Sequence, residues 1–252
     1  MYIYKRSIIH RIFLCLGLIS IVLVGSCKNY SNSQKENTLY DTVLSCVLNG
    51  DAEIVLEEPV SITEITEIYT HIYEYEPAVN GLSKSLSLKK LNDDSDLVAS
   101  IGFIYSLSKE EIIERETENE TIIDEISASI YSETDVKLKL QKIIETITNG
   151  LIYDDEAPDC NTSYAALCKK SANCHGISKA FVMACQKMNI NAGYCIGELN
   201  GIKHIWNYVK IGNSSIQIDL TSNDNKDYIL NEPYPDGTRS LDSFIEMHGF
   251  DF

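Results

Sequence analysis

The stretch CHGISKAFVMACQKM, residues 174–188, predicts a single helix. Its apolar side chains recur at i, i+4, i+7 and i+11, the spacing of one buried helical stripe: Ile177, Phe181, Ala184 and Met188. Cys174 lies three residues before Ile177, so we expect its thiol on the buried side of the first turn. Cys185 shares the stripe three turns later and is expected to be a small core side chain.

Cys174 is the residue of this helix best placed for chemistry. The first turn of a helix leaves backbone N–H groups unpaired and carries positive potential, which lowers the pKa of a thiol toward the reactive thiolate. The same N–H groups can receive the oxyanion that forms when a carbonyl is attacked. The sequence therefore predicts a cysteine nucleophile, with its own backbone N–H as an oxyanion donor.

A strand hairpin follows this helix. Residues 205–211 (IWNYVKI) and 215–220 (SIQIDL) predict two antiparallel strands joined by a Gly-Asn loop, which pairs Ile211 with Ser214. One face of the hairpin is then apolar, with Ile205, Val209, Ile211, Ile216, Ile218 and Leu220. The other face is polar and holds His204, Trp206, Gln217, Asp219 and Thr221. A one-residue slip would expose the apolar set, so burial favours this register.

His204 is the base expected for the nucleophile. The same register pairs Trp206 with Asp219, which puts His204 diagonally from Asp219 at about 7–8 Å between backbones. Cys174 would attack, His204 would take and return the proton, and Asp219 would orient the imidazole and favour its charged form. His175 is set aside as the base, because consecutive helical side chains diverge.

Three motifs resemble the transglutaminase-like superfamily of papain-type thiol enzymes: CHGISKAF (174–181), HIWNYVKI (204–211) and IDLTSND (218–224). Tyr153-Asp154 and SYAAL (163–167) resemble the sequence that precedes the nucleophilic cysteine in that family. The resemblance covers about residues 134–224. It implies an α+β, papain/transglutaminase-like core, in which a central helix packs against an antiparallel sheet, and it assigns the triad to Cys174, His204 and Asp219.

The resemblance is incomplete at the oxyanion hole. Papain places a glutamine upstream of its cysteine, whereas this chain has no glutamine there, and Cys168 stands six residues before Cys174. Tyr164 is a candidate second donor.

The N-terminal 26 residues are typical of an export signal. Lys5, Arg6 and Arg11 precede the apolar run 12–24, which is short for a membrane span of about 20 residues. The run ends in Val-Gly-Ser before Cys27, which resembles the bacterial lipobox, where the cysteine receives a lipid. An uncleaved membrane anchor is the alternative. A lipid on Cys27 would hold the protein on the extracytoplasmic face of a bacterial membrane.

The rest of the chain divides into three regions by pattern. The polar stretch within residues 27–38 predicts a flexible tether. Residues 39–108 predict a small α+β region with strands at 52–56, 82–88 and 97–107 and a helix at 63–73. The resemblance assigns residues 109–252 to a transglutaminase-like domain. Its sequence predicts one helix that starts at a capping box at 108–111 and a second helix from about 134 to Asn149-Gly150.

Eight cysteines bear on redox state and metal binding. Cys15 leaves with the signal and Cys27 takes the lipid, so six remain: Cys46, Cys160, Cys168, Cys174, Cys185 and Cys195. Export permits disulfides, and Cys160 with Cys168 is the readiest local pair. A zinc site of Cys160, Cys168, Cys174 and His175 competes with that pair but lacks the usual spacing of zinc modules. We expect no cofactor and no metal.

Composition limits the partners. The 252 residues carry 37 acidic and 21 basic side chains, a formal net charge of −16, which disfavours binding to nucleic acid. We therefore expect a lipid-anchored thiol enzyme that acts on peptide or amide bonds of a protein or peptide substrate through an acyl-enzyme. Water as acceptor would make it a protease, and an amine would make it a crosslinking enzyme. The alternative is a non-catalytic surface module for binding or assembly.

Overall fold

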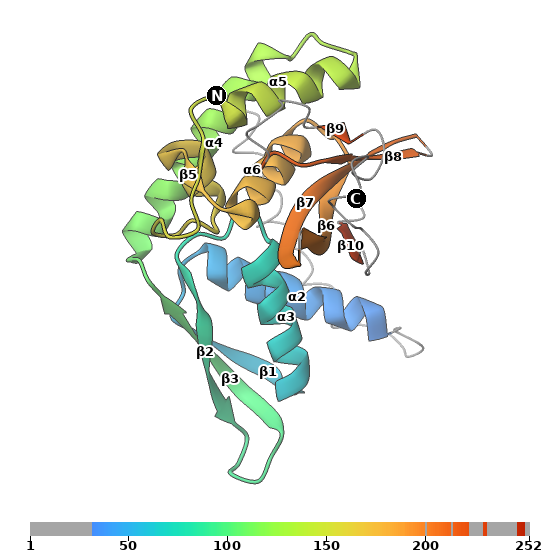
Figure 1. The fold of residues 1–252 in the computed structure, drawn as a ribbon. Helices are drawn as coiled ribbons and strands as arrows, with labels where there is room; N and C mark the ends of the chain where they lie inside the picture. The colour runs from blue at the N-terminus through green and yellow to red at the C-terminus, as the bar shows by residue number, and fades with distance from the viewer. Residues whose placement is uncertain (1–31, 200, 213, 222–228, 231–245, 250–252) are drawn as a thin grey trace. The chain divides into compact units, whose positions relative to one another are not determined.

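The structure, a computed structural model, describes residues 32–199, 201–212, 214–221, 229–230 and 246–249 (Figure 1). It combines helices with antiparallel sheets, which confirms the predicted α+β class. The chain divides into two compact units, Met1–Leu39 and Tyr40–Phe252, and the site described below lies within the second. The predicted signal and Cys27 fall outside the described residues. Within the described ranges, no helix has the length and apolar character needed to traverse a bilayer.

The first elements are two helices and three strands, in the order α2 (Asn32–Leu48), β1 (Glu53–Ser61), α3 (Ile62–Tyr75), β2 (Leu82–Lys90) and β3 (Leu97–Tyr105). The three strands form an antiparallel sheet in the order β1-β3-β2. Helix α3 begins where the Ser61 hydroxyl accepts a hydrogen bond from the backbone N–H of Glu64 at 3.1 Å, an N-cap. The strands and α3 occur where the sequence predicts them.

Helix α2 begins inside the stretch assigned to a flexible tether. Val43 and Val47, one turn apart, are both buried and anchor the C-terminal half of this helix. Helix elongation adds one hydrogen bond for each residue that it fixes, so an anchored helix extends into neighbouring polar residues at little cost. The structure thus includes residues 32–38 of the stretch predicted as a tether in helix α2.

Two longer helices follow, α4 (Lys109–Ser129) and α5 (Val136–Thr148). The predicted capping box is confirmed, because the Glu111 N–H donates to Ser108 Oγ at 3.3 Å and the Ser108 N–H donates to Glu111 Oε2 at 2.8 Å. Helix α5 ends at the predicted place. Asn149 is its C-cap and Gly150 follows with a φ of 73°, a left-handed conformation that glycine adopts without strain.

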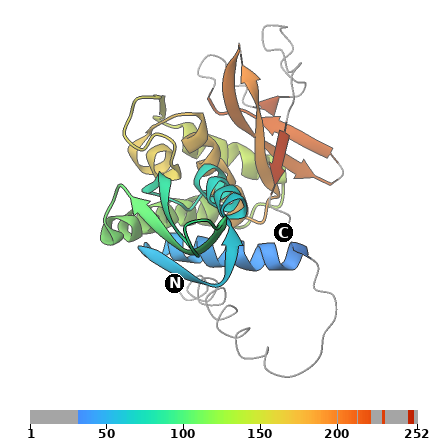
Figure 2. The same cartoon turned by 90° about the horizontal axis from the view of Figure 1, so that it is seen from below.

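The central helix α6 (Cys174–Lys187) contacts the sheet strands β6 (Ala192–Leu199) and β7 (Ile202–Ile211) as well as α4 and α5 (Figures 1 and 2). Just before it, β4 (Ile152–Tyr153) pairs in parallel with β5 (Ser171–Ala172), and a short π-helix, η1 (Ala165–Lys169), lies between them in sequence. This arrangement places the N-terminus of α6 at the end of β5.

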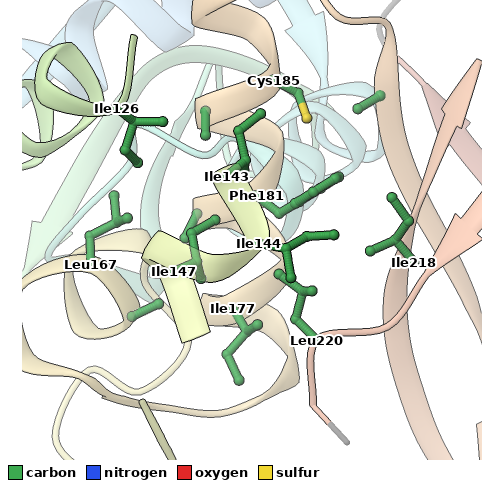
Figure 3. Packing of buried hydrophobic residues seen from close by; sticks show 14 of the residues in the cluster. Ile126, Ile143, Ile144, Ile147, Leu167, Ile177, Phe181, Cys185, Ile218 and Leu220 are labelled. Carbon is green, nitrogen blue, oxygen red and sulfur yellow. The ribbon is translucent and has the colours of Figure 1, made fainter. Parts of the chain in front are cut away.

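The apolar stripe of α6 forms the main core, as predicted. Ile177, Phe181 and Cys185 are buried and pack with side chains of α5 and of the end of β8 (Figure 3). Their neighbours in that cluster include Ile143, Ile147, Ile218 and Leu220. Met188, the last predicted member, is only partly buried because the helix ends at Lys187.

The second sheet has five strands in the order β10-β6-β7-β8-β9, completed by β8 (Ser214–Ile218), β9 (Ile229–Leu230) and β10 (Glu246–Gly249). Ile211 pairs with Ser214, which confirms the predicted register. The pairing of Trp206 with Asp219 is wrong, because β8 ends at Ile218. The Asp219 carboxylate accepts the backbone N–H of Thr221 at 3.0 Å, and this local turn replaces further strand pairing.

The face of β7 that carries His204 is buried. Trp206 and Tyr208 are both buried there and form a second apolar cluster with Cys195 of β6. The indole N–H of Trp206 donates to Gln217 Oε1 at 2.9 Å, so a polar residue of this face satisfies the buried ring. The sheet is therefore covered on both faces near His204.

Candidate active site

Cys174 is the first residue of α6 and its side chain is buried. Asn173 caps the helix, because its Oδ1 accepts the N–H of His175 at 3.0 Å and the N–H of Gly176 at 3.3 Å. These two bonds occupy the N–H groups of the first turn that follow the cysteine. The backbone N–H of Cys174 therefore stays the predicted oxyanion donor.

Gly176 lets a neighbouring loop approach the start of α6. A Cβ at this position would stand 2.3 Å from the carbonyl oxygen of Cys160 and 2.7 Å from that of Thr162. Both atoms belong to backbone, so no side-chain rotation would relieve the clash. The glycine two residues after the nucleophile thus has a packing reason, which the sequence analysis did not find.

His204 and Asp219 are in direct contact at the end of the hairpin. His204 Nε2 lies 3.0 Å from Asp219 Oδ2, and both side chains are buried. Thr221 holds the other carboxylate oxygen, since its hydroxyl donates to Asp219 Oδ1 at 2.6 Å. The ring of Trp206 stacks on the imidazole, with centroids 5.7 Å apart. The predicted proximity of His204 and Asp219 is therefore present, although it comes from a turn rather than from strand pairing.

The protonation states at the site follow from these contacts. Burial lowers the pKa of His204, but hydrogen bonds to Asp219 and to Cys174 outweigh burial and raise the pKa to about 9. Burial raises the pKa of the Cys174 thiol, but hydrogen bonds to His175 and His204, together with their charges, lower it to about 6. At neutral pH the arrangement therefore favours a thiolate beside protonated imidazole.

His175 also contacts the thiol, which corrects the expectation that its side chain diverges from Cys174. Its Nδ1 lies 4.0 Å from Cys174 Sγ, and its Nε2 lies 3.2 Å from Glu74 Oε2 on α3. Side chains of a helix lean toward its N-terminus, so a ring on the second residue reaches back to the first. The angle between consecutive residues on a helical wheel is therefore not enough to predict whether these two side chains are in contact.

Glu74 is a site residue that the sequence analysis missed. It lies in the last turn of α3, where the helix dipole disfavours a negative charge. A carboxylate in that position needs a compensating cation, and this is the sequence signal that could have drawn attention to it. The hydrogen bond to His175 lowers the pKa of Glu74, although burial alone would raise it. The charges of Lys84 and Lys179 lower this pKa further.

The two tyrosines near the family motifs differ in position. The Tyr164 hydroxyl donates to Glu118 Oε2 at 2.9 Å, so the proton that an oxyanion donor would use is bound to a carboxylate. Tyr153 lies next to Cys174 instead. Burial, the nearby Cys174 charge and a hydrogen bond to Asp155 Oδ1 at 3.1 Å raise the pKa of Tyr153.

The remaining cysteines are thiols. All six cysteines of the described residues are free, so the local disulfide between Cys160 and Cys168 is not formed. The sulfur of Cys160 accepts a hydrogen bond from Asn173 Nδ2 at 3.3 Å, whereas the thiol of Cys168 donates to Asn119 Oδ1 at 3.5 Å. Each sulfur therefore has its own partner. Among the described residues, no cluster of three or more metal-ligating side chains occurs.

The chain is similar to known proteins over a segment that contains Cys174, His204 and Asp219. A solved structure described as "Crystal structure of a TGase" is 15% identical with a TM-score of 0.39, and the match covers 69% of this chain and 51% of that one. Another, "a Putative Cysteine Protease from Cytophaga hutchinsonii", is 14% identical with a TM-score of 0.36, and covers 68% of this chain and 67% of that one. The chain thus spans about half the length of the first. No curated protein matches. Residues 124–226 match the family model of the Transglutaminase-like superfamily, so this segment of the chain, which contains Cys174, His204 and Asp219, is similar to that superfamily.

Proposed function

We propose that this protein is a thiol enzyme that acts on peptide or amide bonds through an acyl-enzyme on Cys174. The observation that carries the proposal is the buried His204–Asp219 contact at 3.0 Å beside a thiol whose pKa falls to about 6. A low thiol pKa and a base oriented by a third group are the two requirements of cysteine nucleophilic catalysis.

The reaction follows from these groups. The Cys174 thiolate forms a bond to the carbonyl carbon, and the oxyanion that results accepts the backbone N–H of Cys174. Protonated His204 gives its proton to the leaving amine as the C–N bond breaks, which leaves an acyl-enzyme and a neutral imidazole. His204 then takes a proton from water or from an acceptor amine as that nucleophile attacks and the thiolate leaves. Asp219 keeps the imidazole oriented and stabilises its charge.

The proposal also includes the location. A lipid on Cys27 would anchor the protein to the extracytoplasmic face of a bacterial membrane, where a protein or peptide would be the substrate. The signal-like N-terminus and the Val-Gly-Ser-Cys sequence support this part of the proposal.

Turnover of a generic protein tests the activity. The full-length chain is incubated with labelled casein, with and without dansylcadaverine as an amine acceptor. We expect casein fragments if water resolves the intermediate and dansylated casein if the amine does, and the Cys174→Ala variant should lose either product.

An acyl-enzyme trapped on Cys174 and seen by intact-mass spectrometry would support the same conclusion. Unchanged casein, no acyl-enzyme and equal alkylation of all cysteines would instead favour a non-catalytic surface module.

A further inference from the structure

A second imidazole–carboxylate pair lies beside the nucleophile. His175 contacts Cys174 Sγ at 4.0 Å through Nδ1 and Glu74 Oε2 at 3.2 Å through Nε2. Glu74 belongs to α3, outside residues 124–226 that match the superfamily. We propose that the Glu74–His175 pair holds Cys174 as a thiolate in parallel with the His204–Asp219 pair, so that the region before residue 109 completes the active site. This inference rests on the proposed function and deepens it.

The end of α3 is fixed against α6 and β6 by two partly buried hydrogen bonds. Lys179 Nζ donates to the carbonyl oxygen of Tyr73 at 2.7 Å, and the Tyr194 hydroxyl donates to that of Tyr75 at 2.7 Å. These carbonyl groups lie in the last turn of α3, where they have no partner within the helix. The bonds fall on both sides of Glu74 and determine its position next to α6.

The charges around the pair keep both members ionised. Lys84 of β2 lies 3.8 Å from Glu74, and buried Lys179 of α6 also stabilises its negative charge. His175 interacts with Cys174 on its other side. Cys174 in turn interacts with His204 and Tyr153, and Asp219 contacts His204. Burial lowers the pKa of His175, but the contacts with Cys174 and Glu74 outweigh burial and raise the pKa to about 9.

His204 and His175 then have different roles. In the acyl transfer, His204 donates the proton that the leaving amine needs, so its positive charge is lost in that step. His175 forms and breaks no bond. It keeps its proton because Glu74 stabilises the charged ring, and it continues to stabilise the sulfur when that sulfur leaves as a thiolate. His175 is therefore an electrostatic partner of the reacting sulfur, and Glu74 is a positioning residue.

Alkylation of Cys174 in the full-length chain tests the pair without any substrate. Iodoacetamide labelling is followed from about pH 5 to about pH 9, and the Cys174 peptide is quantified by mass spectrometry. We expect Glu74→Gln and His175→Gln to move the thiolate midpoint up by about one pH unit, so that labelling at pH 6 falls by about 5–10-fold while labelling at pH 9 changes by less than about 2-fold. Glu74→Asp should restore part of the rate at pH 6. Glu67→Gln, an exposed change on the same helix, should leave the profile unchanged.

The outcomes separate this inference from the proposed function. If the labelling profiles of Glu74→Gln and His175→Gln superimpose on that of the wild type, the proposed role of the Glu74–His175 pair is overturned. If the profile of His204→Gln is nevertheless shifted to higher pH, the proposed function stands. If the profile of His204→Gln also equals that of the wild type, both the second pair and the proposed function are overturned.

Wild-type NMR titration gives the same test if a variant does not fold. A His175 ring that titrates near pH 9 supports the inference, and one that titrates near its ordinary value of about 6.5 overturns it.

Discussion

Cys174 has imidazole neighbours on two sides, and only one of them was predictable. Strand parity placed His204 and Asp219 on one face, because side chains alternate along a strand whatever the rest of the fold does. His175 was excluded on an angle that ignores how helical side chains lean toward the N-terminus. Glu74 lies 101 residues before His175 in the chain numbering and reaches it only through the docking of α3. No local pattern contains that information.

Asp219→Asn should separate orientation from charge at His204. The amide nitrogen would face His204 Nε2 as a donor, which favours the neutral ring and removes the attraction that holds the pKa near 9. The pKa of a group raised by a partner falls when the partner's charge is lost, so the alkaline limb of the activity profile should move down by about two pH units. We expect kcat/KM at neutral pH to fall by a factor on the order of 10²–10⁴.

The matched control is Asp93→Asn, an exposed carboxylate in the turn between β2 and β3. Its profile should coincide with that of the wild type. An Asp219→Asn enzyme with the wild-type alkaline limb would show that the carboxylate does not set the state of His204.

At the scale of elements, α6 is the part of the fold that sequence periodicity predicts best. Its apolar stripe and its start at Cys174 follow from one 15-residue pattern, whereas its partner α5 is known only from the structure. Helix α2 escaped prediction because its apolar content is low and its stability comes from the burial of Val43 and Val47. The end of β8 was also missed, because a side chain, Asp219, terminates the strand through Thr221. Local periodicity does not describe such side-chain turns.

Two helix caps give a test at this scale. Asn173→Ala and Ser108→Ala each remove an N-cap, and each should lower the free energy of unfolding by about 1 kcal/mol. Only Asn173 lies next to the nucleophile, so only Asn173→Ala should slow the alkylation of Cys174 at pH 6. Chemical denaturation and mass-spectrometric labelling measure the two effects. Equal labelling rates for both variants would show that the cap of α6 does not position the thiol.

At the scale of the whole molecule, the structure gives residues 39–108 a role at the candidate site that the sequence did not indicate. Sequence pattern predicts a small α+β region, and the structure gives it helix α3, which brings Glu74 to His175 beside Cys174. The residues of the candidate site therefore come from elements spread over more than half of the described chain. The matched family segment alone contains His175 but lacks its carboxylate partner.

Cys27→Ala tests the proposed anchoring. A diacylglyceryl group on Cys27 would attach the full-length protein to membranes, since each buried methylene contributes about 0.8 kcal/mol. We expect the wild-type protein in the membrane fraction of expressing bacteria, with the lipid mass on the peptide that begins at Cys27. The variant should lose that mass. A wild-type protein whose Cys27 carries no lipid would contradict the proposed anchor.

The most direct test of the account is the pH dependence of Cys174 reactivity. Iodoacetamide labelling of the Cys174 peptide, followed from about pH 5 to about pH 10, should show a midpoint near pH 6 in the wild type. The His204→Gln variant should show a midpoint at least about one unit higher. A wild-type midpoint near pH 9, or a His204→Gln profile equal to that of the wild type, would contradict the claim that these imidazoles activate the thiol.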